Sequence, residues 1–182
     1  MKPIRSTAGR RRLVLPAFVL AAACLSAPGP ARAAVLYELD AASNYQEGCF
    51  DPCDCVHRMT DTLRGTFLMA LVGENGGTST FAVTDVAWNY RYGEELVQVT
   101  GFGSYTLGPD GHRLELDLVA GNAPQRHFDS GLVAAPGTFP EIDSAAAANG
   151  FFCYDFVFTV SASAKPVLPE YPTWGALKAT YR

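Results

Sequence analysis

Hydrophobic and polar residues alternate with a period of two over most of residues 35–164, and turn-forming residues interrupt this pattern about every ten residues. Leu114, Leu116 and Leu118 fall on one face of such a segment, with charged residues on the other, as in an antiparallel strand with one buried face. The pattern predicts its clearest strands at residues 66–72, 80–92, 96–107, 112–119 and 151–160. Turn motifs at 74–77 (Glu-Asn-Gly-Gly) and 108–111 (Gly-Pro-Asp-Gly) predict tight connections between them.

Consecutive hairpins without helical crossovers predict an all-β domain of about eight strands, either an antiparallel sandwich or an up-and-down barrel. In the last strand Phe152, Tyr154, Phe156, Phe158 and Val160 share one face, which we expect to be buried and to close the core. The alanine run at 145–148 predicts at most one helical turn. The Gly-Phe-Gly segment at 101–103 predicts a bend or a close approach of two backbones.

Aromatic residues in the second of these strands are the first candidate for a binding site. Trp88, Tyr90 and Tyr92 follow one another at every second position, whereas Phe81 and Val83 have the opposite phase. The apolar face therefore changes near residue 85, which indicates either a β-bulge or a phase that faces solvent. If Trp88, Tyr90 and Tyr92 are exposed, they form a flat platform that could bind a sugar or an apolar ligand. If they are buried, they belong to the core.

Residues 1–33 have the organisation of a cleavable export signal. Basic residues precede an apolar stretch at 13–25, and Ala31-Arg32-Ala33 supplies a small-residue cleavage pattern. This predicts a secreted or periplasmic protein with a β domain at 34–164. Two variants of this signal stay open. One is a twin-arginine signal at residues 9–14 (Gly-Arg-Arg-Arg-Leu-Val), and the other is lipidation of Cys24.

Composition and charge narrow the class of function. The chain has 182 residues, of which 48% are hydrophobic and 18% charged, so it is not intrinsically disordered. Without the leader, eight basic residues remain against eighteen acidic ones, a net charge of −10. This charge disfavours nucleic acid as a partner. After the leader, no apolar run is long enough for a membrane span.

Four cysteines remain after the leader: Cys49, Cys53, Cys55 and Cys153. An even number in an exported protein predicts two disulfides. We expect one bridge within the cluster, from Cys49 to Cys53 or Cys55, with the remaining cysteine bound to Cys153. The alternatives are a metal site formed by the 49–55 cluster with His57, or a reactive thiol.

Candidates for catalysis are few. His127, Asp129 and Ser130 are the residue types of a hydrolase triad, but neighbours in sequence do not readily adopt triad geometry, and Ser130 lacks a nucleophile elbow. The Asp-Ser-Gly segment at 129–131 instead predicts a turn held by side-chain hydrogen bonds. We therefore favour a ligand-binding, surface-binding or structural module without a cofactor. A hydrolase acting through His127 and nearby carboxylates is the alternative, beside the metal-binding one.

Residues 165–182 predict a proline-rich linker followed by a short amphipathic helix or tail. Thr173 would cap this helix, with Trp174, Leu177 and Tyr181 on its apolar side. So short a helix is marginal in isolation, so it packs on its own domain or docks a partner.

Two internal motifs carry a resemblance, Gly-Cys-Phe-Asp-Pro-Cys-Asp-Cys at 48–55 and His-Phe-Asp-Ser-Gly-Leu at 127–132. On these the chain resembles uncharacterised, exported, β-rich bacterial proteins over most of residues 35–164. The ending at 173–182 is similar to a short C-terminal signature of some exported bacterial proteins. The resemblance implies an exported location. The expected partner, a carbohydrate or a cell-surface ligand, follows from the aromatic residues Trp88, Tyr90 and Tyr92 and not from the resemblance. It implies no activity and no catalytic residue.

Overall fold

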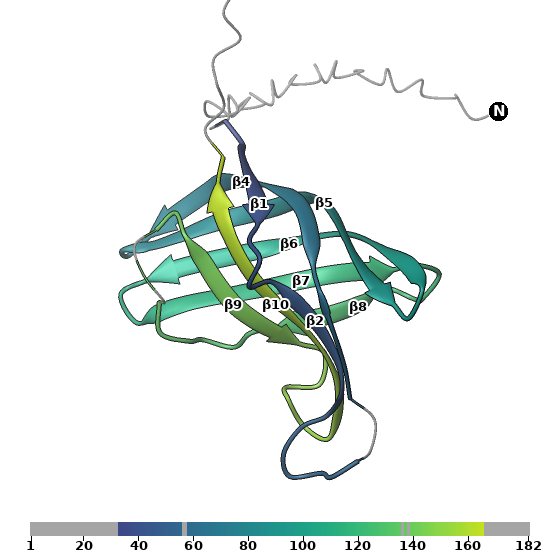
Figure 1. The fold of residues 1–182 in the computed structure, drawn as a ribbon. Helices are drawn as coiled ribbons and strands as arrows, with labels where there is room; N and C mark the ends of the chain where they lie inside the picture. Colours follow the sequence, from purple (N-terminus) through teal and green to yellow (C-terminus); the bar gives the residue numbers. More distant parts are fainter. Residues whose placement is uncertain (1–32, 56–57, 136, 138, 166–182) are drawn as a thin grey trace, which may run out of the picture. The chain divides into compact units, whose positions relative to one another are not determined.

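The computed structural model describes residues 33–55, 58–135, 137 and 139–165, and this part of the chain holds ten strands and no helix (Figure 1). The strands are β1 (Val35–Leu39), β2 (Asn44–Cys49), β3 (Arg58–Thr62), β4 (Arg64–Asn75), β5 (Thr78–Tyr92), β6 (Glu95–Gly108), β7 (Gly111–Ala120), β8 (Arg126–Asp129), β9 (Ile142–Ala147) and β10 (Tyr154–Ala164). The all-β prediction is confirmed. The predicted leader and C-terminal tail lie, except for residues 33 and 165, outside the described residues.

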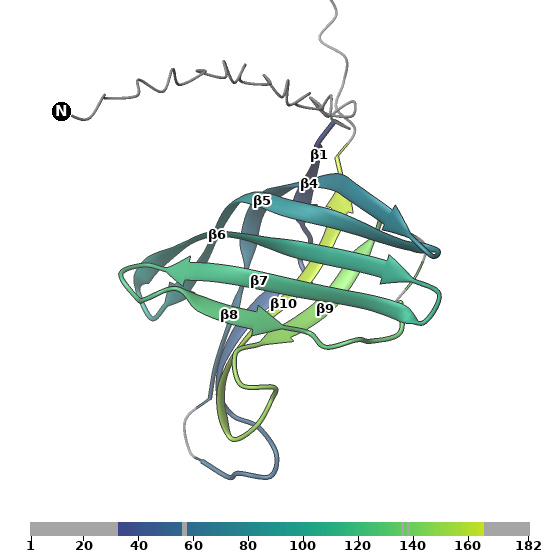
Figure 2. The ribbon, with the colours of Figure 1, turned by 180° about the vertical axis from the view of Figure 1, so that it is seen from behind.

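The strands form one antiparallel sheet in the order β1-β4-β5-β6-β7-β8-β9-β10-β2-β3, and a further pairing of β1 with β10 closes it. Strand β10 pairs with β9 along one edge and with both β2 and β1 along the other. Figure 1 shows β9, β10 and β2 on one side of this closed sheet, and Figure 2 shows β5 to β8 on the opposite side. Of the two predicted architectures, the pairing is that of an up-and-down barrel.

A β-bulge in β5 explains the change of phase near residue 85. The pairing of β5 with β6 shifts between Val83 and Val86, and Asp85 has a positive φ of 50°. The extra residue lets Val83 on one phase and Val86 on the other both point inward, where they are 1% and 3% exposed. Of the two predicted explanations, the bulge is therefore correct.

The interior is packed with aromatic rings. Trp88 lies between Phe67 of β4 and Phe158 of β10, with ring centroids 5.9 and 6.1 Å from theirs. Phe128 of β8 meets Phe158 edge to face at 4.9 Å. These contacts join strands from opposite sides of the barrel, so one core forms inside the closed sheet.

The predicted burial of the last strand is only partly correct. Phe158 and Val160 are each 1% exposed, and Phe156 is half-buried, but Tyr154 and Phe152 are 44% and 57% exposed. The reason is that β10 begins at Tyr154 and its first residues pair with β2 beyond the packed core, so this end has no opposite wall of core side chains.

The alanine run forms part of strand β9 rather than a helical turn, which corrects the sequence prediction. Ala146 pairs with Phe158 and is fully buried. Pairing with β10 thus outweighs the helix propensity of alanine, since small side chains fit beneath the large rings of the core.

Two glycines in β6 allow β7 to approach closely, which is one of the two alternatives predicted for residues 101–103. A Cβ atom at Gly103 would lie 2.0 Å from the backbone oxygen of Glu115, and one at Gly101 would lie 2.1 Å from that of Asp117. Any side chain at these positions would push β7 away.

We therefore expect Gly103→Ala to lower the free energy of unfolding by about 1–3 kcal/mol, because β7 must shift to make room. Gly73→Ala in β4 is the matched control, since a Cβ there would meet nothing within 4 Å. Urea unfolding followed by circular dichroism measures both variants. Equal losses in the two would contradict this account of Gly103.

Candidate functional site

A cavity of about 430 Å³ opens at the end of the barrel where the β5–β6 hairpin and the β7–β8 turn lie. Its apolar wall consists of Val97, Leu118, Ala120, Phe128, Phe156 and Phe158. Its polar groups are Tyr45, Glu47, Tyr90, Tyr92, Glu95 and Arg126, and residues 121–124 of the β7–β8 turn complete the rim. The cavity is thus mostly apolar, with charged groups of both signs.

The two-residue period of the strands brings these side chains together. Tyr90 of β5 pairs with Val97 of β6, and Tyr92 pairs with Glu95 next to the hairpin turn. These positions continue the phase that buries Trp88 deeper in the barrel. The cavity is therefore the outer continuation of the core, where side chains no longer fill the interior.

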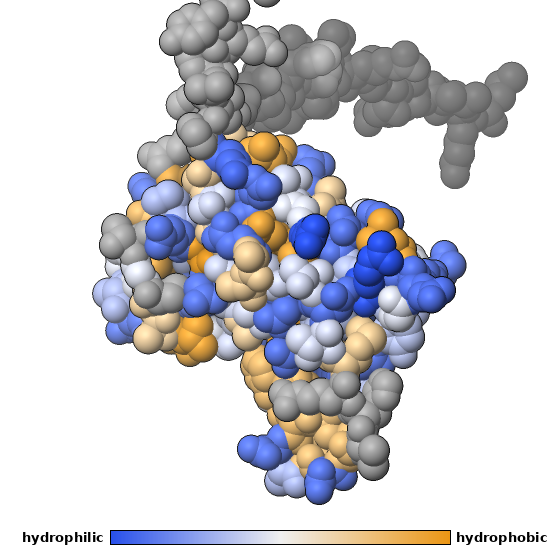
Figure 3. All heavy atoms as spheres, in the orientation of Figure 1, coloured by the Kyte–Doolittle hydropathy of each residue, from blue (hydrophilic) through white to orange (hydrophobic). Residues whose placement is uncertain are grey.

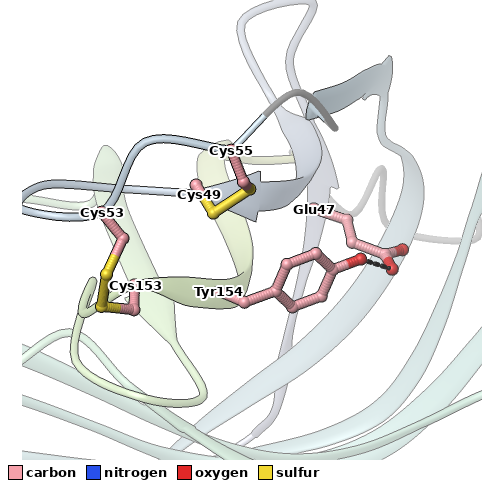
Figure 4. Close-up of a disulfide and its surroundings, with 6 residues drawn as sticks. All are labelled: Glu47, Cys49, Cys53, Cys55, Cys153 and Tyr154. Atoms are coloured by element: carbon pink, nitrogen blue, oxygen red, sulfur yellow. Dashed lines mark hydrogen bonds between the residues drawn. A yellow bond between two sulfur atoms is a disulfide. The ribbon is translucent and has the colours of Figure 1, made fainter.

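Two tyrosine hydroxyls hold the carboxylate of Glu47. The hydroxyl of Tyr45 donates to Oε2 at 2.9 Å, and that of Tyr154 donates to Oε1 at 2.6 Å, the contact drawn in Figure 4. The Tyr45 ring stacks on Tyr90 with centroids 4.1 Å apart. Burial is the main cause that raises the pKa of both Tyr45 and Tyr90, so both phenols stay protonated at neutral pH.

Arg126 is the cation of the cavity. It is half-buried, and its Cζ lies 3.9 Å from the centre of the Phe156 ring, a cation–π contact. Neither Arg126 nor Glu47 was a candidate from the sequence. The available signal was their spacing of two from the inward-facing Phe128 and Tyr45, but β8 and β2 are short and show no clear alternation.

The three aromatic residues predicted to bind a ligand occupy three different environments. Trp88 is 1% exposed and packs in the core, Tyr90 is 5% exposed and borders the cavity, and Tyr92 is 45% exposed at its rim. They do not form one exposed platform, because the inward phase of β5 runs from the core to the mouth. A binding role for Tyr90 and Tyr92 stays a prediction.

The predicted turn at residues 129–131 is present. The backbone N–H of Gly131 donates to the Asp129 carboxylate, and the Ser130 hydroxyl donates to the carbonyl of Gly131. Ser130 Oγ also accepts the N–H of Leu114. His127 contacts Asp117 instead, with 3.3 Å between Nδ1 and Oδ1. None of these contacts directs the imidazole toward the serine hydroxyl.

The carboxylates beside His127 are held by an arginine. Arg113 binds Asp129 through two hydrogen bonds, of 2.9 and 2.6 Å, and also contacts Glu115 at 3.1 Å. The hydrogen bonds from Arg113 are the main cause that lowers the pKa of Asp129. Glu115, His127 and Asp129 offer ligand atoms within 4.8 Å of one another, but Arg113 already occupies two of the three. An ion pair therefore accounts for this cluster.

The cysteines form two disulfides, Cys49–Cys55 and Cys53–Cys153 (Figure 4). This confirms one of the two predicted arrangements, and the bridges indicate an oxidising compartment. All four sulfurs are bonded to sulfur, so the alternatives of a metal site or a reactive thiol in this cluster do not hold. His57 lies outside the described residues.

The disulfide-linked loops extend beyond the barrel and carry an apolar surface (Figures 1 and 3). Phe151 and Phe152 are 37% and 57% exposed there, and the ring of Phe50 lies edge to face with Phe151. Exposed acidic residues, Asp51 and Asp54, lie within the same loops. Within the described part of the chain, no helix is long and apolar enough to cross a lipid bilayer.

A comparison of the chain with protein-family models, curated proteins and solved structures finds no match in any of the three.

The two disulfides differ in the length of chain they close, and so in their expected effect on stability. Cys53–Cys153 spans 100 residues and Cys49–Cys55 spans 6. The double variant Cys53→Ser with Cys153→Ser should lower the free energy of unfolding by about 4–5 kcal/mol. The double variant Cys49→Ser with Cys55→Ser should lower it by about 2 kcal/mol. Chemical denaturation without reductant measures both; a larger loss for the short loop would refute this order.

The buried tyrosines predict a loss of stability in alkali. Burial raises the pKa of Tyr37 from 10.0 to about 12, and it also raises that of Tyr105. These phenols ionise more readily in the unfolded chain than in the folded one. Their contribution to the free energy of unfolding is therefore complete below pH 10 and is lost as the pH rises through about 12. We expect the free energy of unfolding to fall over this range, and Tyr37→Phe to fall less steeply. Parallel curves for the two proteins would contradict this assignment to Tyr37.

Proposed function

We propose that this protein is an exported binding module whose barrel-end cavity takes a small molecule with an apolar body. The observation that carries the proposal is the cavity itself, which is about 430 Å³ in volume, with a wall of Phe, Leu, Val and Ala side chains and with Tyr, Glu and Arg side chains beside them. Binding sites for small molecules have volumes of roughly 300–1,000 Å³ and this same division between apolar wall and polar anchors.

The surroundings of the cavity support a preformed site. Its wall side chains come from strands whose partners are fixed by backbone pairing, such as Tyr90 with Val97 and Leu118 with Arg126. Tyr45 and Tyr90 are stacked and buried, so little ordering is needed when a ligand enters. A low ordering cost favours affinity.

The apolar wall favours an apolar ligand over the carbohydrate suggested by the aromatic pattern. A sugar exposes hydroxyl groups on most of its edges, and each needs a hydrogen-bond partner when it is buried. Phe128 and Phe158 in the wall offer none, and both oxygens of the Glu47 carboxylate already accept hydroxyl groups of the protein. Export is supported by the two disulfides and by the signal-like leader of the sequence.

A neutral, environment-sensitive fluorophore tests the proposal. N-phenylnaphthylamine should gain fluorescence when titrated with the protein, and Ala120→Phe, which fills the cavity, should weaken its binding at least about tenfold. Ala87→Phe makes the same change at an exposed position of β5 and should leave binding unchanged. No gain in fluorescence up to the solubility limit of the probe, or equal binding by all three proteins, would overturn the proposal.

A further inference from the structure

Arg126 gives the cavity a chemical preference that its shape alone does not provide. Strand β8 pairs Arg126 with Leu118 of β7, and Phe128, two residues further on, is buried in the core. Arg126 therefore lies on the inward phase of its strand, at the mouth of an apolar cavity. A charged side chain in this phase is unusual, since every other cavity position on β7 and β8 is apolar.

The guanidinium of Arg126 contacts Phe156 and has no ion-pair or hydrogen-bond partner among the residues that the structure describes. Arg113, on the adjacent strand β7, shows the contrast, since its guanidinium binds Asp129 in two places and also contacts Glu115. A guanidinium carries five N–H donors and is never deprotonated in proteins, so a half-buried one favours an anionic acceptor.

Two carboxylates also face the cavity, and they differ from Arg126 in their surroundings. Both oxygens of Glu47 already accept tyrosine hydroxyls, from Tyr45 and Tyr154. Glu95 is exposed beside the hairpin turn, where water and salt screen its charge. The strongest unsatisfied hydrogen-bonding group at the mouth is therefore the cation.

From these contacts we infer that the ligand is an amphipathic anion, with a carboxylate bound by Arg126 and an apolar body in the Phe-lined cavity. A carboxylate matches the guanidinium because two oxygens can accept two parallel N–H donors. The contact with the Phe156 ring holds the N–H donors of the guanidinium in a fixed orientation. This inference rests on the proposed function, as it concerns the same cavity.

Matched ligands separate the inference from the proposed function. Octanoate, octanol and octylamine share one apolar chain and differ only in charge, and each is tested for displacement of bound N-phenylnaphthylamine. We expect octanoate to bind about tenfold more tightly than octanol, and octylamine to bind no more tightly than octanol. Equal affinities, or a preference for octylamine that would assign the head group to Glu47 and Glu95, overturn the inference while leaving the proposed function intact. If the fluorophore itself does not bind, the proposed function fails.

Variants of two arginines assign the preference to one side chain. Arg126→Gln should abolish the tenfold advantage of octanoate over octanol, and continued displacement of the fluorophore by octanol shows that the variant is folded. Arg126→Lys should retain part of the preference for octanoate over octanol, because lysine keeps the positive charge but lacks the two parallel N–H donors of a guanidinium. Arg91→Gln is the matched control, because Arg91 is exposed and lies in β5 between Tyr90 and Tyr92, on the opposite phase. An equal loss in Arg91→Gln would mean that general charge, not Arg126, sets the preference.

Discussion

The pairing of β10 is the constraint on which the rest of the structure depends. One edge of β10 pairs with β9, and its other edge pairs first with β2 and then with β1, which closes the sheet. In a closed sheet each strand has one face toward the interior, and alternate side chains along the strand point into that interior. The Cys53–Cys153 bridge fastens the loop after β2 to the residue just before β10, so a covalent bond supports this same junction.

The interior divides into a filled and an unfilled part along the same strands. Strand β5 illustrates this, since its inward residues progress from Trp88, fully buried, to Tyr90 at the cavity wall and Tyr92 at the rim. The inward-facing residues of one strand can therefore either pack in the core or line the cavity. Which of the two occurs depends on whether side chains from the opposite strands fill the interior at that level. The bulge at Asp85 is what places this phase of β5 inward.

The sequence predicted those features that rest on local chemistry. The long hairpins followed from turn residues and alternation, the disulfides from an even number of cysteines, and the turn at Ser130 from its neighbours. The close approach at Gly103 followed from a glycine within a strand. Features that depend on partners far along the chain could not be predicted, and β9 is the clearest case, because an alanine run becomes a strand only through its pairing with β10. Arg126 was missed for a similar reason, since only the register of β8 against β7 shows that it faces inward.

The most direct measurement of the central claim is a nuclear magnetic resonance titration of the isotopically labelled protein with octanoate. An apolar cavity that ends at an arginine predicts that the Nε–Hε signal of Arg126 shifts, together with the amide signals of residues 90–97 and 118–128. The signals of the disulfide-linked loops should not move. Shifts confined to those loops or to the outer face of the barrel, or the absence of any shift at Arg126, would contradict the account.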